Sequence, residues 1–290
     1  MNIREPCLPP GWYPRARGKI EEFLEPFAKN RVAAADNGQV SVAAISPHAG
    51  WYFSGACAAA SVSSLDPGAE TVAVIGGHLG RGMPVLTASE EGVRTPLGTM
   101  PFDLELRDEF RKGVALRSDQ YADNTVEVLL PMVHYFFPHS RLLWLRFPAE
   151  ISSYKAGKLL FEAAASLGRR IVVLSSTDLT HYGNNYNFSP KGSGKTALEW
   201  VKKVNDAAFI SAVLGGDPSL VLKRAEEDWS ACSAGSVLGA LGFTASAGKT
   251  TARLLDYRTS ADADDYDEIP DSFVGYASIS FITESIFPIQ

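Results

Sequence analysis

The feature that most constrains the fold is the alternation of short apolar segments with segments of helical periodicity. Expected strands cover 40–45, 71–76, 141–147, 170–176, 251–257 and 273–282. Helical patterns cover 54–65, 104–114, 125–137, 152–167, 194–214, 217–227 and 231–242. Strands that are apolar almost throughout are typical of a sheet buried on both faces. The alternation therefore predicts an α/β fold with a central, mostly parallel or mixed sheet flanked by helices.

Composition indicates a globular chain. Of its 290 residues, 46% are hydrophobic and 21% are charged, which excludes wholesale disorder and coiled coil. A chain of this length buries enough surface to form a stable core without disulfide bonds or structural metals. Because no Gly-, Pro- or Ser-rich linker divides it, we expect a single domain over 1–290, with an irregular N-terminal segment at about 1–38.

The charge balance and the cysteine content indicate which binding partners and which cellular compartment to expect. The balance of 27 basic and 33 acidic residues, without a Lys/Arg block, argues against nucleic acid. No apolar run approaches the ~20 residues that span a bilayer, so we expect no membrane partner. Three cysteines do not suggest a disulfide framework. The N-terminal residues lack the apolar stretch of a signal peptide, so we expect a cytoplasmic protein.

Histidines follow three of the expected strands. The segments are SPHAGWY at 46–52, GGH at 76–78 and SSTDLTHYG at 175–183, and the whole chain has five histidines. Parallel strand ends share one edge of a sheet, where ligands bind. Neutral imidazole is the commonest metal ligand, and His48 and His78, on adjacent strand ends, could bind one ion. The alternative for any single histidine is an ordinary core or surface residue.

Cys232 begins the last expected helix within the segment SACSAG at 230–235. A helix N-terminus favours the thiolate, which is the metal-binding form of cysteine. The small flanking residues would let a ligand approach. The alternative is a buried structural cysteine.

Asp178 and His181 are three residues apart in a loop or first helical turn. This spacing lets a carboxylate orient an imidazole that acts as a general acid or base. The alternative for Asp178 is a helix N-cap, and the two roles are compatible.

Two further segments suggest less specific interpretations. Residues 258–272 are acidic and indicate a solvated surface loop, because the spacing of an EF-hand calcium loop is absent. The segment KGSGKT at 191–196 resembles the end of a P-loop, but Ser189 replaces its first glycine and no apolar strand precedes it.

Taken together, five segments carry a family resemblance. They are PHAG at 47–50 followed by Tyr52, Ser54 and Gly55; RTPL at 94–97; STDLTHYG at 176–183; Cys232; and SFVGYA at 272–277. In this order they resemble the Memo family, also described as AmmeMemoRadiSam system protein B. The matches extend from about residue 40 to 282. The resemblance implies a fold similar to the class III extradiol ring-cleaving dioxygenases.

The resemblance also implies a site. His48, His78 and Cys232 would ligate a metal, with Asp178 and His181 beside it and His181 as the acid/base. Dioxygenases of this type use Fe(II), which is therefore the first expectation. A thiolate ligand makes copper or zinc an alternative.

The sequence departs from the family pattern around this site. Gly76-Gly77-His78 is shorter than the family's Gly-Pro-Ser-His, and Ser233-Ala234-Gly235 replaces its Gly-Arg-His. The family's Glu-x-His appears as Glu127-Val128-Leu129, and its Ala-Gly-Ser-Trp-Tyr as Pro10-Gly11-Trp12-Tyr13.

Three functions follow as hypotheses. The first is a metal-dependent oxidoreductase that uses O₂ on a small organic substrate, for which an aromatic compound is one candidate. Trp51, Tyr52 and Tyr182 are candidates for the walls of its substrate site. The second is a metal-binding protein that acts through protein partners without catalysis. The third is a metal-assisted hydrolase.

Overall fold

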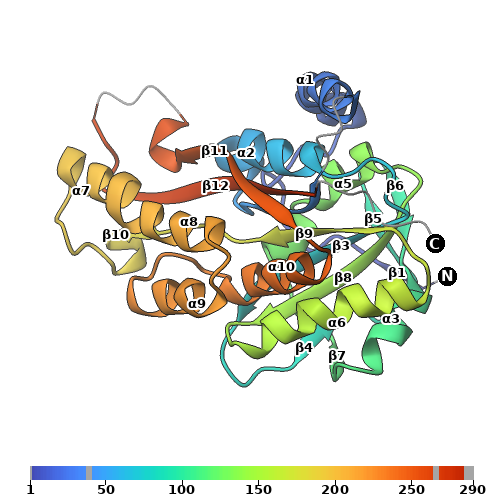
Figure 1. Cartoon of the computed structure of the whole chain (residues 1–290). Coiled ribbons are helices and arrows are strands. Elements are labelled where there is room, and N and C mark those ends of the chain that lie inside the picture. The colour runs from blue at the N-terminus through green and yellow to red at the C-terminus, as the bar shows by residue number, and fades with distance from the viewer. Residues whose placement is uncertain (1, 37–40, 264–267, 284–290) are drawn as a thin grey trace.

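The computed structural model describes residues 2–36, 41–263 and 268–283. It confirms the expected α/β class, with a mixed central sheet between two layers of helices (Figure 1). The strands are β1 (Ile3–Arg4), β2 (Ser41–Ser46), β3 (Thr71–Leu79), β4 (Val85–Thr87), β5 (Gly92–Thr95), β6 (Gly98–Pro101), β7 (Leu116–Ser118), β8 (Arg141–Pro148), β9 (Ile171–Ser176), β10 (His181–Gly183), β11 (Thr250–Thr259) and β12 (Ser272–Thr283).

Apart from α1, the helices agree with the expected helical segments; two of these segments, 125–137 and 194–214, are each divided into two helices. They are α1 (Arg17–Asp36), α2 (Trp51–Ser64), α3 (Leu104–Arg111), α4 (Asn124–Glu127), α5 (Leu130–Phe136), α6 (Ser152–Ser166), α7 (Gly194–Trp200), α8 (Asp206–Leu214), α9 (Pro218–Glu227) and α10 (Ala234–Ser246). A π-helical turn, Val201–Asn205, joins α7 to α8.

Strand order explains how distant segments meet. Among the described residues the main sheet has the order β10-β12-β2-β9-β3-β8-β4-β7, and β11 pairs with β12. The four strands β2, β9, β3 and β8 are parallel to their neighbours within this group. Their carboxyl ends therefore share one edge of the sheet, as the strand–helix alternation predicts.

The central strands are buried on both faces because their side chains alternate between two cores. Val72 and Val74 of β3 pack in one core with residues of α1, α2 and α5. Ala73 and Ile75 pack in the other with residues of α6, α8 and α10. Figure 1 shows α2 and α5 on one side of the sheet and α6 and α10 on the other.

Glycines allow α6 and α10 to pack closely. A Cβ on Gly157 of α6 would lie 2.0 Å from the carbonyl oxygen of Gly239, and a Cβ on Gly242 would lie 1.9 Å from that of Tyr154. This close approach holds α10 directly against α6.

The expectation of an irregular N-terminal segment at about 1–38 is wrong. Residues 17–36 form the 20-residue helix α1, which packs on α2 and α5. Ile20 and Leu24 are completely buried in that contact. The sequence pattern did not predict this helix because few of its residues are apolar and because it contains Pro26.

Other surface expectations have mixed outcomes. The acidic segment 258–272 ends β11 and forms a short 3-10 turn at Ser260–Asp262, while 264–267 lie outside the described residues. The helix α7 in the P-loop-like segment follows a turn rather than a strand.

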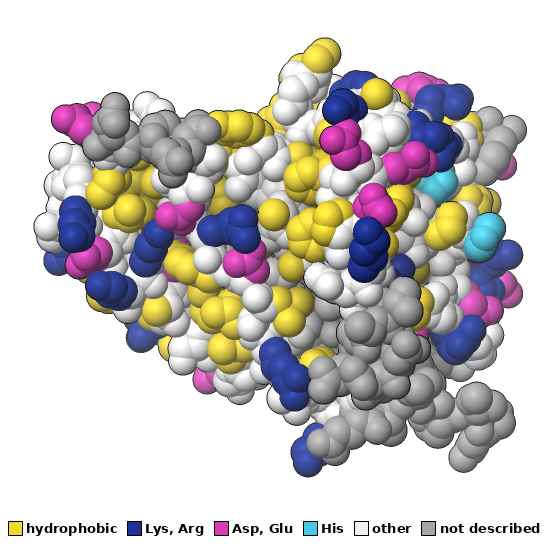
Figure 2. Space-filling model, turned by 90° about the horizontal axis from the view of Figure 1, so that it is seen from above, with side chains coloured by type: hydrophobic (Ala, Val, Ile, Leu, Met, Phe, Trp, Pro, Cys, Tyr) yellow, Lys and Arg dark blue, Asp and Glu magenta, His cyan; other side chains and the backbone are white. Residues whose placement is uncertain are grey.

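Within residues 2–36, 41–263 and 268–283, every helix is too short or too polar to cross a membrane. On the face shown in Figure 2, basic side chains lie among acidic ones rather than in one block.

Candidate metal centre

Three strand ends at the carboxyl edge of the sheet build the site. His48 lies two residues after β2, Asp178 lies two residues after β9, and His78 is the penultimate residue of β3. The expectation that His48 and His78 lie on adjacent strand ends is wrong, because β9 lies between β2 and β3. The end of β9 therefore places Ser176 and Asp178 beside His48.

A β-bulge directs His78 into the site. The pairing of β3 with β8 passes from Gly76↔Arg146 to Leu79↔Pro148, so Gly77 and His78 oppose a single residue. His78 has a positive φ of 56°, a conformation that non-glycine residues adopt only under constraint. Bulges commonly re-aim a side chain beside an active site.

Cys232 reaches the site from the loop before α10. The helix begins at Ala234, so Cys232 precedes it instead of starting it. The backbone N–H of Cys232 donates to the carbonyl oxygen of Asp178 at 3.2 Å, which ties this loop to the end of β9.

Ser233 and Gly235, which follow Cys232, serve close packing. A Cβ on Gly235 would lie 2.1 Å from the carbonyl oxygen of Pro148. Similarly, a Cβ on Gly77 would lie 2.3 Å from Cβ of Ser233. These contacts press the Cys232 loop onto the ends of β3 and β8.

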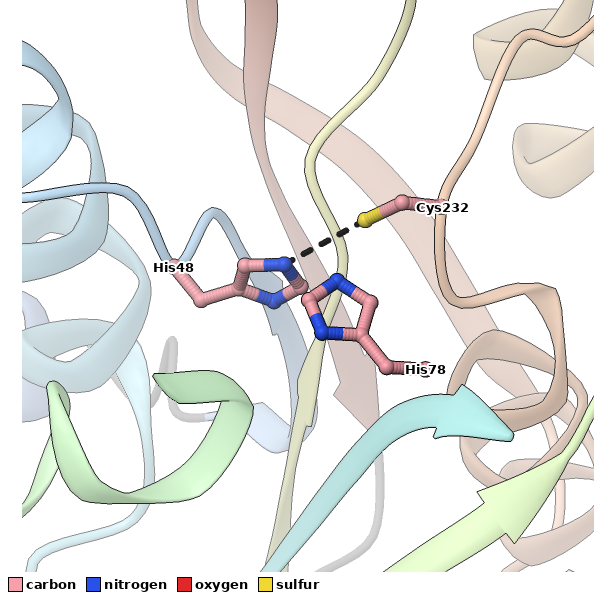
Figure 3. A group of neighbouring side chains, drawn as sticks. All are labelled: His48, His78 and Cys232. Carbon is pink, nitrogen blue, oxygen red and sulfur yellow. Dashed lines mark hydrogen bonds between the residues drawn. The ribbon is translucent and has the colours of Figure 1, made fainter. Parts of the chain in front are cut away.

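The three side chains converge on one point (Figure 3). One donor atom each from His48, His78 and Cys232 lies within 4.8 Å of the other two. Sγ of Cys232 is 3.2 Å from Nε2 of His48, and the two imidazole rings are edge to face with centroids 4.9 Å apart. His48 is buried, His78 is exposed on one side and Cys232 is half-buried.

Outer hydrogen bonds fix both imidazoles. Nδ1 of His48 is 2.6 Å from Oγ of Ser176, and Nδ1 of His78 is 3.0 Å from Oδ2 of Asp123. Nε2 of each ring then faces the thiol, as Figure 3 shows. A ring nitrogen held in this way by an oxygen acceptor is typical of histidines that bind metals.

The charges of the site depend on one another. Burial by itself lowers the pKa of His78, but hydrogen bonds with Asp123 and Cys232 outweigh it and raise that pKa to about 10. Burial also opposes charge on His48, yet Asp178 and Cys232 leave its pKa raised. For Cys232, burial acts to raise the pKa, whereas the two imidazoles hold it well below its usual range. The two imidazoles therefore favour the thiolate form of Cys232, which is the form that binds metals.

This donor set fits a transition-metal ion. Two imidazole nitrogens and a thiolate suit zinc, copper or iron, whereas magnesium and calcium prefer oxygen ligands. The outer partners leave one nitrogen of each ring for the metal. The candidate ligands expected from the sequence are thus brought together.

Asp178 and His181 lie beside these three residues in different roles. Oδ1 of Asp178 accepts from the backbone N–H of His48 at 2.7 Å, so it orients that histidine's backbone and not His181. Asp178 caps no helix, since it lies in the turn between β9 and β10. Burial raises its pKa.

A cavity of about 680 Å³ opens onto the site. His48, His78, Asp178 and His181 all line it. Tyr52 lines it as expected, but Trp51 and Tyr182 are buried in the cores and do not. Its remaining aromatic side chains are Trp12, Phe53, Tyr186 and Tyr276.

Sequence reasoning missed four residues of the site. Asp123 holds His78, and the Asn124 amide donates to the carbonyl oxygen of His48 at 2.9 Å. Arg146 pairs with Asp123 at 3.0 Å, and Trp12 forms part of the cavity wall. An Asp-Asn pair at the start of the helical segment 125–137 was the available signal for the first two.

A family model described as "Memo-like protein" matches residues 4–280. The chain belongs to the Memo-like family. A MEMO1 family protein of Pyrococcus abyssi is 30% identical over 96% of this chain and 98% of the relative. MEMO1 family proteins of Thermococcus onnurineus and Methanosarcina mazei are each 30% identical over 96% of this chain and 99% of the relative.

Among solved structures, an uncharacterized protein of Escherichia coli K12 matches with a TM-score of 0.44 and 11% identity, over 81% of this chain and 98% of that one. This similarity is too weak to bear on function.

Two departures from the Memo pattern have a structural basis in this Memo-like chain. Ser233, which directly follows Cys232, accepts through Oγ from the backbone N–H of His78 at 3.3 Å. Glu127 is buried and accepts from the Tyr13 hydroxyl and from the backbone N–H of Cys7 and Leu8. Both residues therefore hold the walls of the site in place.

Proposed function

We propose that the protein is a metal-dependent oxidoreductase that acts on a small organic substrate. His48, His78 and Cys232 are the ligands, and His181 is the acid/base. The observation that carries this proposal is the convergence of three donor atoms within 4.8 Å at the wall of a cavity. The outer hydrogen bonds of both imidazoles support the same assignment.

Fe(II) is the first candidate for the metal, with copper or zinc as alternatives. When bound, iron would supply the redox chemistry that activates dioxygen. The chain's own contribution is to hold the ligands rigidly: Ser176 and Asp123 orient the rings, and Asp178 fixes the backbone of His48.

His181 is suited to move a proton. Its Nδ1 lies 3.0 Å from the carbonyl oxygen of Leu179. A carbonyl oxygen only accepts, so Nδ1 carries the hydrogen and Nε2 has the free lone pair. Nε2 is therefore the atom that would take a proton from the substrate or return one.

The cavity favours an apolar organic substrate, and an aromatic compound is one candidate. Tyr52 and Phe53 lie at the start of α2 with ring centroids 4.9 Å apart, and both line the cavity. Aromatic side chains with their faces accessible favour flat, apolar groups.

The experiment that tests this proposal is dioxygen uptake by iron-loaded protein with a panel of small organic compounds that includes catechols. For a compound that is turned over, His181→Gln should reduce the rate by about 10²-fold or more while metal content stays unchanged. The exposed His139→Gln is the matched control. Unchanged turnover in His181→Gln would refute the assigned role, and turnover without dioxygen would instead indicate a hydrolase.

A non-catalytic metal-binding protein acting through protein partners is the second candidate. It is favoured by the exposure of Tyr52 and Phe53 at the cavity, at 60% and 41%. Exposed aromatic side chains are common in protein interfaces. This candidate predicts bound metal with no dioxygen uptake across the panel.

A further inference from the structure

We infer that the metal centre has a second entrance, on its thiolate side, that admits small uncharged molecules independently of the larger cavity. This inference deepens the proposed function and rests on the same site. It concerns the route to Sγ of Cys232, which exists whether or not a metal is bound.

Two cavities reach the metal centre from different sides. The larger one, of about 680 Å³, is lined by His48 and His78 but not by Cys232. A smaller one, of about 400 Å³, is lined by Cys232 but by neither ligand histidine. The three ligands are therefore approached from two sides.

His181 and Tyr186 separate the two cavities. They are the residues that line both. Their rings are edge to face, with centroids 4.9 Å apart and planes at 83°. The hydrogen bond of His181 to Leu179 holds one ring, so the pair forms a wall between the two spaces.

The lining of the smaller cavity selects its occupant by chemistry. Ala225, Ala231 and Trp229 give it mainly apolar walls. Its carboxylate, Glu226, is paired with Arg81 at 2.8 Å. With this carboxylate paired and the other walls formed by alanines and an indole, the cavity suits a small uncharged molecule.

Trp229 lies at the smaller cavity in a constrained conformation. Its φ is 52°, in the left-handed region that is uncommon for a bulky residue. Its ring is stacked on Phe188 with centroids 5.6 Å apart and planes at 12°, and the preceding carbonyl, of Asp228, accepts from Asn205 at 2.9 Å. These contacts hold the indole at this position although 57% of the residue is exposed. Strained residues of this kind occur at functional sites.

Two entrances have a consequence for the order of binding. An organic substrate in the larger cavity would block access along the side of His48 and His78. The smaller cavity would remain open to a second, small reactant such as dioxygen. The two reactants would therefore reach the centre from opposite sides of the His181–Tyr186 wall.

Alkylation of metal-free protein by iodoacetamide tests this route. The thiolate of Cys232 supplies the electron pair for the new S–C bond, and iodide leaves. The rate at Cys232 is followed by peptide mass spectrometry, with Cys7 in the same sample as internal reference. Ala225→Trp and the exposed Glu226→Trp fill the smaller cavity. Pro10→Trp adds the same side chain to the larger one.

We expect Ala225→Trp and Glu226→Trp to slow alkylation of Cys232 about tenfold or more, because a thiolate reacts only where the reagent reaches it. Pro10→Trp should change the rate less than about twofold. Slowing by Pro10→Trp, with no effect of Glu226→Trp, would show that the larger cavity is the route and would overturn the inference. Failure of the protein to bind metal would refute the proposed function without altering this outcome.

Discussion

Nδ1 of His78 lies 3.0 Å from Oδ2 of Asp123, and the same carboxylate is held by Arg146. Arg146 is buried, and it also pairs with the buried Asp119 at 3.3 Å and donates to the carbonyl oxygen of Gly77 at 3.0 Å. The orientation of one candidate ligand therefore depends on a chain of buried charges that begins on β8. The following predictions test this arrangement and the packing around it.

Asp123→Asn should weaken metal binding by about 10–100-fold, which is typical for loss of an outer carboxylate partner. The asparagine retains the size of Asp123 and an oxygen for the backbone N–H of Thr125. Competition with a chromogenic chelator measures the affinity. Asp108→Asn, on the surface of α3, is the control and should have no effect; equal affinities for Asp123→Asn and wild type would contradict the role of Asp123.

Metal affinity should rise with pH. His78 must lose its proton to bind a metal, and its pKa is about 10 in the metal-free protein. Each displaced proton gives about a tenfold gain in affinity per pH unit below that pKa. Cys232 adds less to this slope because the neighbouring imidazoles hold its pKa well below the usual range. Chelator competition from about pH 7 to 9 checks the slope, and a flat profile would contradict the assignment.

Gly77→Ala should destabilise the protein by about 1–3 kcal/mol, since an added methyl group overpacks the contact with Ser233. The new Cβ would lie 2.3 Å from Cβ of Ser233. Gly80→Ala is a matched control three residues away, because nothing lies within 4 Å of its Cβ. Urea unfolding with and without metal distinguishes the two variants, and equal stability would show that the Cys232 loop is not pressed against β3.

Glu127→Gln should loosen the N-terminal wall of the larger cavity. The buried carboxylate accepts from the backbone N–H and the thiol of Cys7, both at 2.8 Å, and from the Tyr13 hydroxyl at 2.9 Å. A glutamine side chain keeps one acceptor and presents N–H groups to donors, which costs about 1–3 kcal/mol.

The reactivity of Cys7 reports this change. Burial and Glu127 raise the pKa of Cys7 to about 11 in the intact protein, so its thiol should react slowly at pH 8. In Glu127→Gln it should react faster, whereas the exposed Glu162→Gln should leave it unchanged. Slow reaction in both variants would mean that Glu127 does not hold this segment.

Much of the fold could be predicted because its signals are local. The strand at 141–147 and the helix at 152–167 agree with β8 and α6 to within one or two residues, since runs of apolar residues and helical periodicity determine them. The helix α1 was missed because its buried face is narrow, and its stability comes from contacts with α2 and α5.

The residues of the candidate metal centre could be predicted from the sequence, but their geometry could not. His48, His78 and Cys232 lie where the strand ends and the resemblance to the Memo family placed them. The bulge at His78 and the hydrogen bond of Asp178 to the backbone of His48 depend on strand order, which no local pattern reveals. The partnership of Asp123 with His78 joins segments 45 residues apart and could not be read from spacing alone.

The most direct test of the central claim is metal content after anaerobic purification of wild type, His48→Ala and Cys232→Ser, with Cys7→Ser as the matched control. Near-stoichiometric transition metal in wild type and Cys7→Ser, lost in the other two variants, is the predicted result. Absence of metal from wild type even after reconstitution, or its retention in both ligand variants, would contradict the account.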